Sequence, residues 1–337
     1  MKILNQMGPQ VSSMISAQFP DAEMVNVPLE GPINESIAGD VLLSFRRAAT
    51  MVEVAQRVPW LHIAGAGVEG LDLSVFDHGR IVTCSRGAHA IPIAEYVMAT
   101  IIAYERRVPG MWVNDEPKGN WMPLDELEAR IDSGELRPPT DQVLAEPERW
   151  GWMWMGEMVG KTVGLVGFGG IGVAVAERAL AFGMKVVAIR RTKEPSPIEG
   201  VTLMNSLDDL LSESDHIVVC APATKQTNQI INDHSLTKVK PGAHIINVAR
   251  GSLIDEDALI RALDDGRLSL ASLDVGVGEP LKSSHRFYSH PKIRLSPHIS
   301  WTSPRRQERV IGIFVENLHR SIRGEYLLGV VDPTEGY

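Results

Sequence analysis

The sequence predicts an α/β protein built on parallel β-sheets. Short apolar runs of strand length alternate with helical patterns through most of the 337 residues, which is the rhythm of βαβ units. Near the middle of the chain, a glycine-rich turn at residues 167–172 separates a strand-like run from a helical one, as dinucleotide-binding folds require. A chain of this length is also too long for one ordinary core and fits two domains.

The composition is that of an ordinary globular protein. The hydrophobic fraction is 44%, the charged fraction 22% and the net charge −9, which fits neither a disordered chain nor a binder of nucleic acid or anionic membranes. Cys84 and Cys220 have no metal-ligand spacing, so we expect no metal, no disulfide and a reducing, cytoplasmic location. No apolar run reaches the roughly 18 residues of a membrane helix, and no signal-peptide pattern opens the chain.

The elements of the first part of the chain follow from their apolar patterns. A helix over residues 50–57 is expected to begin at Thr50, an N-cap with Glu53 three residues later. A longer helix over residues 92–107 has proline in its first turn and two arginines in its last, where the helix dipole favours positive charge. Strands are expected at residues 2–4, 24–27, 41–45, 61–64 and 81–83.

The alternation is stronger in the second half, which predicts one parallel sheet there. The last helix is expected to stop at Gly324, because glycine adopts the left-handed conformation that ends many helices. Strands are expected at residues 162–166, 185–189, 216–220, 243–248, 270–274 and 293–295, and helices at residues 171–182, 206–211, 255–264 and 304–323.

The glycine-rich turn has the spacing of a dinucleotide-binding fingerprint. Gly167 would allow the tight turn, Gly169 would let the backbone approach a pyrophosphate, and Gly172 would allow close packing of helix on strand. Gly170 and Ile171 open the helix, whose first N–H groups and partial positive charge suit a pyrophosphate. A purely structural glycine turn is the alternative.

The next strand ends at Arg190, Arg191 and Thr192, where an NAD-binding protein usually carries an acid that accepts hydrogen bonds from the adenosine ribose. An arginine cannot accept them, but it can grip a 2′-phosphate through charge-assisted hydrogen bonds of roughly 1.5–3 kcal/mol each. We therefore expect NADP(H) to be preferred, with NAD(H) still able to bind. The alternative is that both arginines are solvated residues at a strand end.

Three short motifs follow, each just after an expected strand. They are Asn247-Val248-Ala249-Arg250-Gly251, then Leu273-Asp274-Val275 with Glu279-Pro280, and finally Ser296-Pro297-His298-Ile299. Open α/β sheets bind their ligands at such strand ends. A single Arg, Glu or His there is more often packed or solvated than catalytic, but three motifs behind one dinucleotide turn form a specific pattern.

With these motifs, the chain resembles the D-isomer-specific 2-hydroxyacid dehydrogenase family over nearly its whole length. The run at residues 160–167 and Pro222 with Thr224 and Thr227 add to the likeness. The resemblance implies two Rossmann-like, doubly wound parallel-sheet domains with the cleft between them. Residues 1–92 and 300–337 would form a discontinuous outer substrate domain, and residues 93–299 a dinucleotide-binding Rossmann domain that includes a Trp-rich insertion at about 108–158.

The resemblance also implies an activity, hydride transfer between NADP(H) and a small 2-keto acid or D-2-hydroxy acid, similar to glyoxylate/hydroxypyruvate reductases. His298 matches the family's acid/base, which gives a proton to the carbonyl oxygen. Glu279 matches its partner, a carboxylate that favours the imidazolium form and fixes the ring. Arg250 matches the residue whose planar fork binds the substrate's carboxylate and keto oxygen.

Other residues match the family's cofactor-binding positions. Asp274 looks like the residue that hydrogen-bonds the nicotinamide amide. The Cys220-Ala221-Pro222 turn and Thr227 resemble the loop that lines the cofactor's other edge. Val248 and Ala249 are expected to contact the cofactor as well.

The outer domain is expected to supply substrate contacts. The loop at residues 64–70 resembles the family's substrate loop, in which the N–H groups of Ala66 and Gly67 would hold the carboxylate. An ordinary glycine turn is the alternative. Arg46 contacts either substrate or solvent, and Trp301 either walls the pocket or belongs to the core.

Residues 108–158 break the α/β rhythm, and segments of this length are usually functional or interfacial. In the family, this part of the chain commonly lies at the dimer interface. We therefore expect a homodimer. In it, this segment would enlarge the two-fold interface or reach the active-site cleft of the partner subunit. The alternative is a solvent-exposed insertion in which the tryptophans pack locally. Its tryptophans are Trp112, Trp121, Trp150, Trp152 and Trp154.

A different class of protein remains the alternative function. Transcriptional corepressors of this family are dinucleotide-sensing binding proteins on the same scaffold, and they can keep the Arg/Glu/His set. No basic patch or interaction tail in the sequence points to such a catalytically weak protein. NAD-linked formate or phosphoglycerate dehydrogenases are an enzymatic alternative that Arg190 and Arg191 disfavour.

Overall fold

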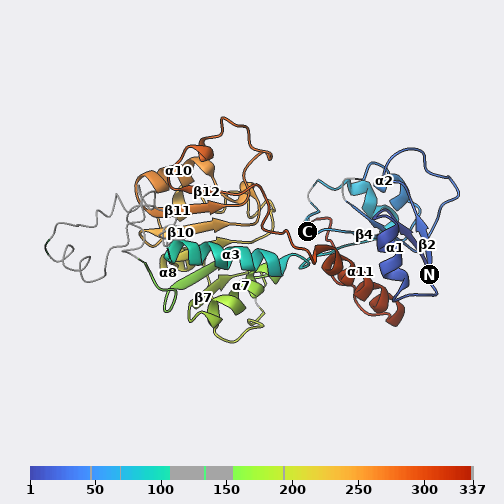
Figure 1. Ribbon diagram of the computed structural model, residues 1–337, viewed down its shortest axis with the longest axis horizontal. Helices are drawn as coiled ribbons and strands as arrows, with labels where there is room; N and C mark the ends of the chain where they lie inside the picture. Colours follow the sequence, from blue (N-terminus) through green and yellow to red (C-terminus); the bar gives the residue numbers. More distant parts are fainter. Residues whose placement is uncertain (46–47, 69, 107–132, 134–154, 193, 335–337) are drawn as a thin grey trace, which may run out of the picture. The chain divides into compact units, whose positions relative to one another are not determined.

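A computed structural model describes residues 1–45, 48–68, 70–106, 133, 155–192 and 194–334. The chain divides into two compact units, one of Met1–Ile91 with Trp301–Tyr337 and one of Pro92–Ser300. Each unit contains one sheet in which all paired strands run parallel (Figure 1). The expected fold class, two parallel-sheet α/β domains, is confirmed. The Trp-rich segment lies almost entirely outside the described residues, and so does Arg46.

The smaller unit carries a five-stranded sheet in the order β2-β1-β3-β4-β5. Ile3 packs on one face with helices α1 and α11, whereas its neighbour Leu4 packs on the other face with α2, since successive strand residues point to opposite sides. Both faces are therefore covered, as parallel sheets require. The elements are β1 (Lys2–Asn5), α1 (Pro9–Ser16), β2 (Glu23–Asn26), β3 (Val41–Ser44), α2 (Met51–Ala55), β4 (Trp60–Ile63), the 3-10 helix η1 (Leu73–Gly79), β5 (Ile81–Cys84) and α11 (Arg306–Arg323).

Two expectations about helix ends are tested in this unit. Thr50 is the N-cap residue of α2, as predicted, but its side chain makes no capping hydrogen bond to the helix. Instead the Thr50 hydroxyl donates to the Pro28 carbonyl at 2.8 Å and accepts from Gln6 Nε2 at 2.7 Å. A long-range contact thus replaced the local one that the sequence pattern favoured. Gly324 does end α11, in the left-handed conformation with φ of 68°.

The larger unit carries a seven-stranded sheet in the order β12-β11-β10-β9-β6-β7-β8. The chain order reverses between β6 and β9, which is the switch point where open α/β sheets bind ligands. Its elements are α3 (Ala90–Glu105), β6 (Thr162–Val166), α7 (Gly170–Ala181), β7 (Lys185–Ile189), β8 (Val201–Leu203), α8 (Leu207–Glu213), β9 (His216–Val219), α9 (Asp233–Leu236), β10 (Ala243–Asn247), η4 (Gly251–Leu253), α10 (Glu256–Asp264), β11 (Leu268–Leu273), η5 (Arg286–Tyr288) and β12 (Ile293–Leu295).

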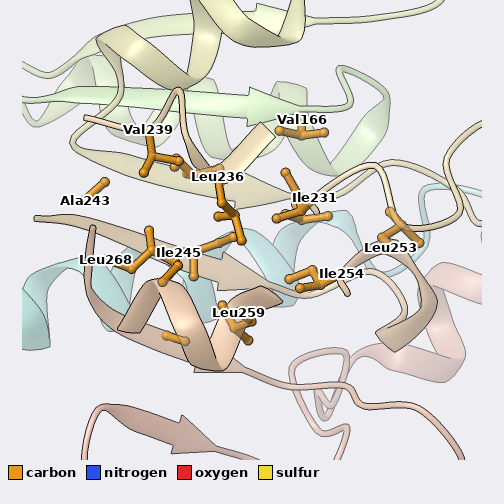
Figure 2. Close-up of a cluster of buried hydrophobic side chains, with 14 of the residues drawn as sticks. Val166, Ile231, Leu236, Val239, Ala243, Ile245, Leu253, Ile254, Leu259 and Leu268 are labelled. Atoms are coloured by element: carbon orange, nitrogen blue, oxygen red, sulfur yellow. The ribbon is translucent and has the colours of Figure 1, made fainter. Parts of the chain in front are cut away.

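One apolar core cluster of this unit lies on one face of its sheet, under α8, α9 and α10, and Figure 2 shows part of it. Val166, Ile245 and Leu268 come from the strands, and Leu236 and Leu259 from the helices. Polar side chains fix where all three helices begin, and the Asn232 side chain caps α9 by accepting from two N–H groups. The Ser206 hydroxyl caps α8 by accepting from the Asp209 N–H, and the Asp255 carboxylate caps α10 by accepting from two N–H groups.

The opposite face of the sheet meets α3 through a buried polar chain. The Glu105 carboxylate accepts a hydrogen bond from His216 Nε2 at 3.0 Å. His216 Nδ1 and His244 Nδ1 are 3.3 Å apart, and His244 Nε2 contacts the Ser272 hydroxyl at 2.9 Å. All four residues are buried. With both rings neutral, one set of tautomers satisfies every contact, because His244 then donates to His216 and Ser272 donates to His244.

Two short elements had no signal in the sequence. β8 has three residues, none of them fully buried, and α9 has four, so neither shows a recognisable period. Helix α3 begins two residues before the expected Pro92 start. Arg106 follows the last helical residue, and no basic residue lies in the last described turn, so the prediction that Arg106 lies in that turn is wrong. Arg107 lies outside the described residues. No helix among the described residues is long and apolar enough to cross a membrane.

The buried chain predicts different outcomes for two substitutions of Glu105. Glu105→Leu leaves the His216 Nε2 donor buried without an acceptor, which costs roughly 1–3 kcal/mol for an unsatisfied buried donor. Glu105→Gln keeps an acceptor oxygen and should cost much less. Urea denaturation followed by tryptophan fluorescence measures both. Equal midpoints for the Leu variant and the unsubstituted chain would contradict this role of Glu105.

Candidate active site

The turn after β6 has the backbone geometry that its glycines suggest. Gly167 has φ of 108°, and a Cβ added there would lie 2.6 Å from the Ala221 nitrogen. A Cβ on Gly172 would lie 2.6 Å from the Gly167 carbonyl oxygen. A Cβ on Gly169, by contrast, would meet nothing within 4 Å. The turn is therefore closed on the protein side and open in front of Gly169.

Helix α7 begins at this open side. Gly169 is its N-cap residue, and Gly170 and Ile171 are the first helical residues. The first N–H groups of a helix have no partner within the helix, and they carry its positive dipole end. The combination fits a pyrophosphate, since a Cβ on Gly169 would meet nothing within 4 Å and the backbone is open there to a ligand.

The loop after β9 lies directly against this turn across the switch point. The Cys220 thiol donates to the Gly167 carbonyl with sulfur and oxygen 3.0 Å apart. Burial raises the pKa of that thiol to about 12, so it stays protonated. Further along the loop, the Thr227 hydroxyl donates to the Pro222 carbonyl at 2.6 Å and closes the turn. The loops after β6 and β9 are thus joined by a hydrogen bond and lie side by side.

Arg190 follows β7 and is already engaged. Its Nε donates to the Thr192 hydroxyl at 2.8 Å, and its Nη2 donates to Glu194 Oε2 at 2.6 Å. The Arg190 side chain is 15% exposed, whereas that of Glu194 is 76% exposed. Arg191 and Thr192 are exposed as well. Glu194 was not among the residues that the sequence pattern singled out.

The loops after β10 and β11 touch each other. A Cβ on the buried Gly251 would lie 2.1 Å from the Gly276 carbonyl carbon, so only glycine fits this crossing. Arg250, the residue before it, is half-buried, and its Nη1 donates to the Ala249 carbonyl at 2.7 Å. Val248 and Ala249 are buried at the end of β10. The crossing fixes where Arg250 leaves the sheet.

His298 and Glu279 form a close pair. His298 Nδ1 and Glu279 Oε2 are 2.6 Å apart, with the two side chains 38% and 33% exposed. The other carboxylate oxygen of Glu279 accepts from the Gly276 N–H at 3.0 Å. Both ends of the carboxylate are therefore held, and the imidazole is oriented by a partner that cannot rotate away freely.

Asp274 holds the loop that carries His298. One carboxylate oxygen accepts from the Ile299 N–H at 2.9 Å and from the Ser296 hydroxyl at 2.5 Å, and the other accepts from the Ser300 N–H at 2.9 Å. Asp274 is 1% exposed. Its carboxylate therefore spans His298 on both sides, and its contacts within the protein fix this loop.

Tyr96 extends this network and was missed at the sequence level. Its hydroxyl lies 2.6 Å from the Ser296 hydroxyl, so α3 reaches the same loop. Burial raises the pKa of Tyr96, and nearby Asp274 adds to the rise. Ser296 stood in a quoted motif, but nothing in the spacing tied Tyr96 to it, since 200 residues separate them.

The larger unit thus brings together the glycine turn, the loop after β9, Arg190 and the Arg250, Glu279 and His298 loops. Ala66 and Gly67 belong to the other compact unit. Ala66 is exposed and Gly67 half-buried, and neither N–H donates to an acceptor among the described residues. Within the described ranges, no group of three or more His, Cys, Asp or Glu side chains could hold a metal ion.

Comparison with known proteins identifies the larger unit first. Residues 138–300 match the family model described as D-isomer specific 2-hydroxyacid dehydrogenase, NAD binding domain. The Thermotoga maritima hydroxypyruvate reductase is 33% identical over 279 residues, which cover 81% of each chain. D-3-phosphoglycerate dehydrogenase 2 of Arabidopsis thaliana is 31% identical, but the match covers 78% of this chain and only 38% of that longer protein.

Solved structures also match this chain over its full length. An NADPH-dependent glyoxylate/hydroxypyruvate reductase from Sinorhizobium meliloti, in complex with NADP and sulfate, is 25% identical with a TM-score of 0.71. That match covers 100% of this chain and 99% of the other. Together with the motifs at the carboxyl ends of β6, β10, β11 and β12, these likenesses show that the chain belongs to the D-isomer specific 2-hydroxyacid dehydrogenase family.

Proposed function

We propose that the chain is an NADP(H)-preferring reductase of small 2-keto acids, with glyoxylate and hydroxypyruvate as the expected substrates and D-2-hydroxy acids as products. The observation that carries this proposal is the 2.6 Å contact between His298 and Glu279 at the sheet edge that also bears the glycine turn. The relatives named glyoxylate or hydroxypyruvate reductase support the substrate class.

Reduction of a 2-keto acid needs a hydride donor, a proton donor and an anchor for the carboxylate. The nicotinamide of a bound dinucleotide supplies the hydride. His298 is the proposed proton donor. Because Glu279 holds Nδ1, the proton would pass to the carbonyl oxygen from Nε2. The Arg250 guanidinium would bind the carboxylate and keto oxygen through its planar fork.

The cofactor would be held along the switch point of the sheet. The first N–H groups of α7, at Gly170 and Ile171, are suited to the pyrophosphate. Asp274 is proposed to position the His298 loop as well as the nicotinamide amide, since its carboxylate already binds that loop. The remaining proposed cofactor contacts are Gly167, Gly169, Gly172, Cys220, Ala221, Pro222, Thr227, Val248 and Ala249.

The preference for NADP(H) rests on the end of β7. Arg190, Arg191 and Thr192 would surround a 2′-phosphate, which an acid at this place would repel. The Sinorhizobium meliloti relative, which is NADPH-dependent and was solved with NADP, supports the proposal.

Substrate contacts from the smaller unit complete the proposal. The N–H groups of Ala66 and Gly67, which no described acceptor engages, would hold the carboxylate. The smaller unit would thus act as the substrate domain and the larger one as the dinucleotide-binding domain. A homodimer and a cytoplasmic location stay predictions of the sequence.

Substitution of His298 tests the assigned chemistry. His298→Asn should lower kcat for glyoxylate by about 100-fold or more, because a positioned acid contributes about 10²–10⁴-fold, while the Kd for NADPH stays unchanged. His234→Asn is the matched control, since this histidine of the same unit is 77% exposed. A loss below about tenfold in His298→Asn would argue against His298 as the proton donor. Negligible turnover by the unsubstituted chain would instead favour the family's catalytically weak, dinucleotide-sensing binding proteins.

Glu279→Gln should lower kcat for 2-keto acid reduction, because the carboxylate that holds His298 Nδ1 at 2.6 Å orients the imidazole. Steady-state assays with glyoxylate and NADPH measure kcat, and an unchanged value would remove Glu279 from this role.

The proposed cofactor preference predicts the ratio of kcat/KM for NADPH and NADH, and NADPH should have the higher value in the unsubstituted chain. Arg190→Met should lower kcat/KM for NADPH by about tenfold or more, because it removes one charge-assisted hydrogen bond. The value for NADH should change little. Circular dichroism checks that the variant folds. An NADH preference, or equal values for the two cofactors, would refute the NADP(H) assignment.

A further inference from the structure

Arg190 is the residue on which the proposed 2′-phosphate contact depends, and a carboxylate already occupies it. Nε and Nη2 form one edge of the guanidinium fork, which is the arrangement that binds two oxygens of a phosphate side by side. In the structure this edge donates to Thr192 Oγ1 at 2.8 Å and to Glu194 Oε2 at 2.6 Å. A phosphate that takes the same edge must displace Glu194.

The exposures of the two partners differ strongly. The Arg190 side chain is 15% exposed, so its guanidinium stays close to the end of β7. Glu194 is 76% exposed and lies four residues further along the chain. An exposed ion pair of this kind is weak, so a doubly charged phosphate can replace the carboxylate. The Arg190 guanidinium is therefore an anion-binding group held in place, and the exposed Glu194 carboxylate is the partner that a phosphate can displace.

Displacement does not remove the charge of Glu194 from the neighbourhood. The backbone keeps this carboxylate within a few residues of Arg190, where it repels a 2′-phosphate through solvent of high dielectric. A cofactor without the 2′-phosphate meets neither the competition nor most of the repulsion. The contact between Arg190 and Glu194 thus lowers the affinity for NADP(H) and leaves that for NAD(H) nearly unchanged.

We propose, on the basis of the function proposed above, that Glu194 is a specificity-determining residue. It competes with the 2′-phosphate of NADP(H) for the Arg190 guanidinium and holds down the preference for NADP(H) over NAD(H). Arg190 supplies the attraction for the phosphate and Glu194 limits it, so the pair sets the ratio of the two affinities.

Adenosine 2′,5′-bisphosphate and adenosine 5′-monophosphate isolate the effect, because they differ only in the 2′-phosphate. Isothermal titration calorimetry of the full chain should show that Glu194→Gln binds the bisphosphate about three- to tenfold more tightly, with the gain shrinking as salt is raised. Affinity for the monophosphate should stay within about twofold. Glu199→Gln is the matched control, an exposed glutamate in the same connection between β7 and β8, and should change neither affinity.

Unchanged, weakened or equally tightened binding of both nucleotides by Glu194→Gln would overturn the role of Glu194. Arg190→Met, measured in parallel, separates this result from a failure of the cofactor proposal. If Arg190→Met weakens the bisphosphate and Glu194→Gln does nothing, only the role of Glu194 is lost. If Arg190→Met leaves bisphosphate affinity unchanged, the phosphate does not meet Arg190 and the proposed cofactor preference fails as well.

Discussion

All paired strands of the Pro92–Ser300 unit run parallel, and this constraint places the chemistry. Every loop that leaves a strand does so at the same edge of the sheet. Residues as distant in sequence as Gly167 and His298 therefore reach one edge without any contact between their own segments. The loops then lock to each other through Gly251 against Gly276 and through the Asp274 carboxylate.

Each lock has a different physical basis. The Gly251 crossing excludes a side chain, so it is a steric requirement on the backbone. The Asp274 network is electrostatic, because a buried carboxylate must be satisfied by hydrogen bonds and two of its donors are the N–H groups of Ile299 and Ser300. Asp274 thus holds the loop that carries His298, and Glu279 holds its imidazole.

Much of this arrangement could be predicted from the sequence. β6, β7 and β12 have the expected bounds, because β6 and β7 are mainly apolar runs and β12 alternates apolar and charged residues as Ile-Arg-Leu. The cap of α2, the contact of Tyr96 with Ser296 and the pair of Arg190 with Glu194 could not. The Thr50 hydroxyl could bond either to the first turn of α2 or to a distant group, and in the structure it donates to the Pro28 carbonyl. Tyr96 lies in an apolar helix whose face toward the loop after β12 is set by tertiary packing.

The proposed activity is a single hydride transfer from NADPH to the carbonyl carbon of a 2-keto acid, and it gives the D-hydroxy acid. The direct test is to reduce hydroxypyruvate with NADPH that carries deuterium at the transferred C4 position, and to analyse the product by mass spectrometry, NMR and chiral chromatography. The account predicts D-glycerate with one deuterium at C2. Unlabelled product, L-glycerate or no turnover above the uncatalysed rate would contradict it.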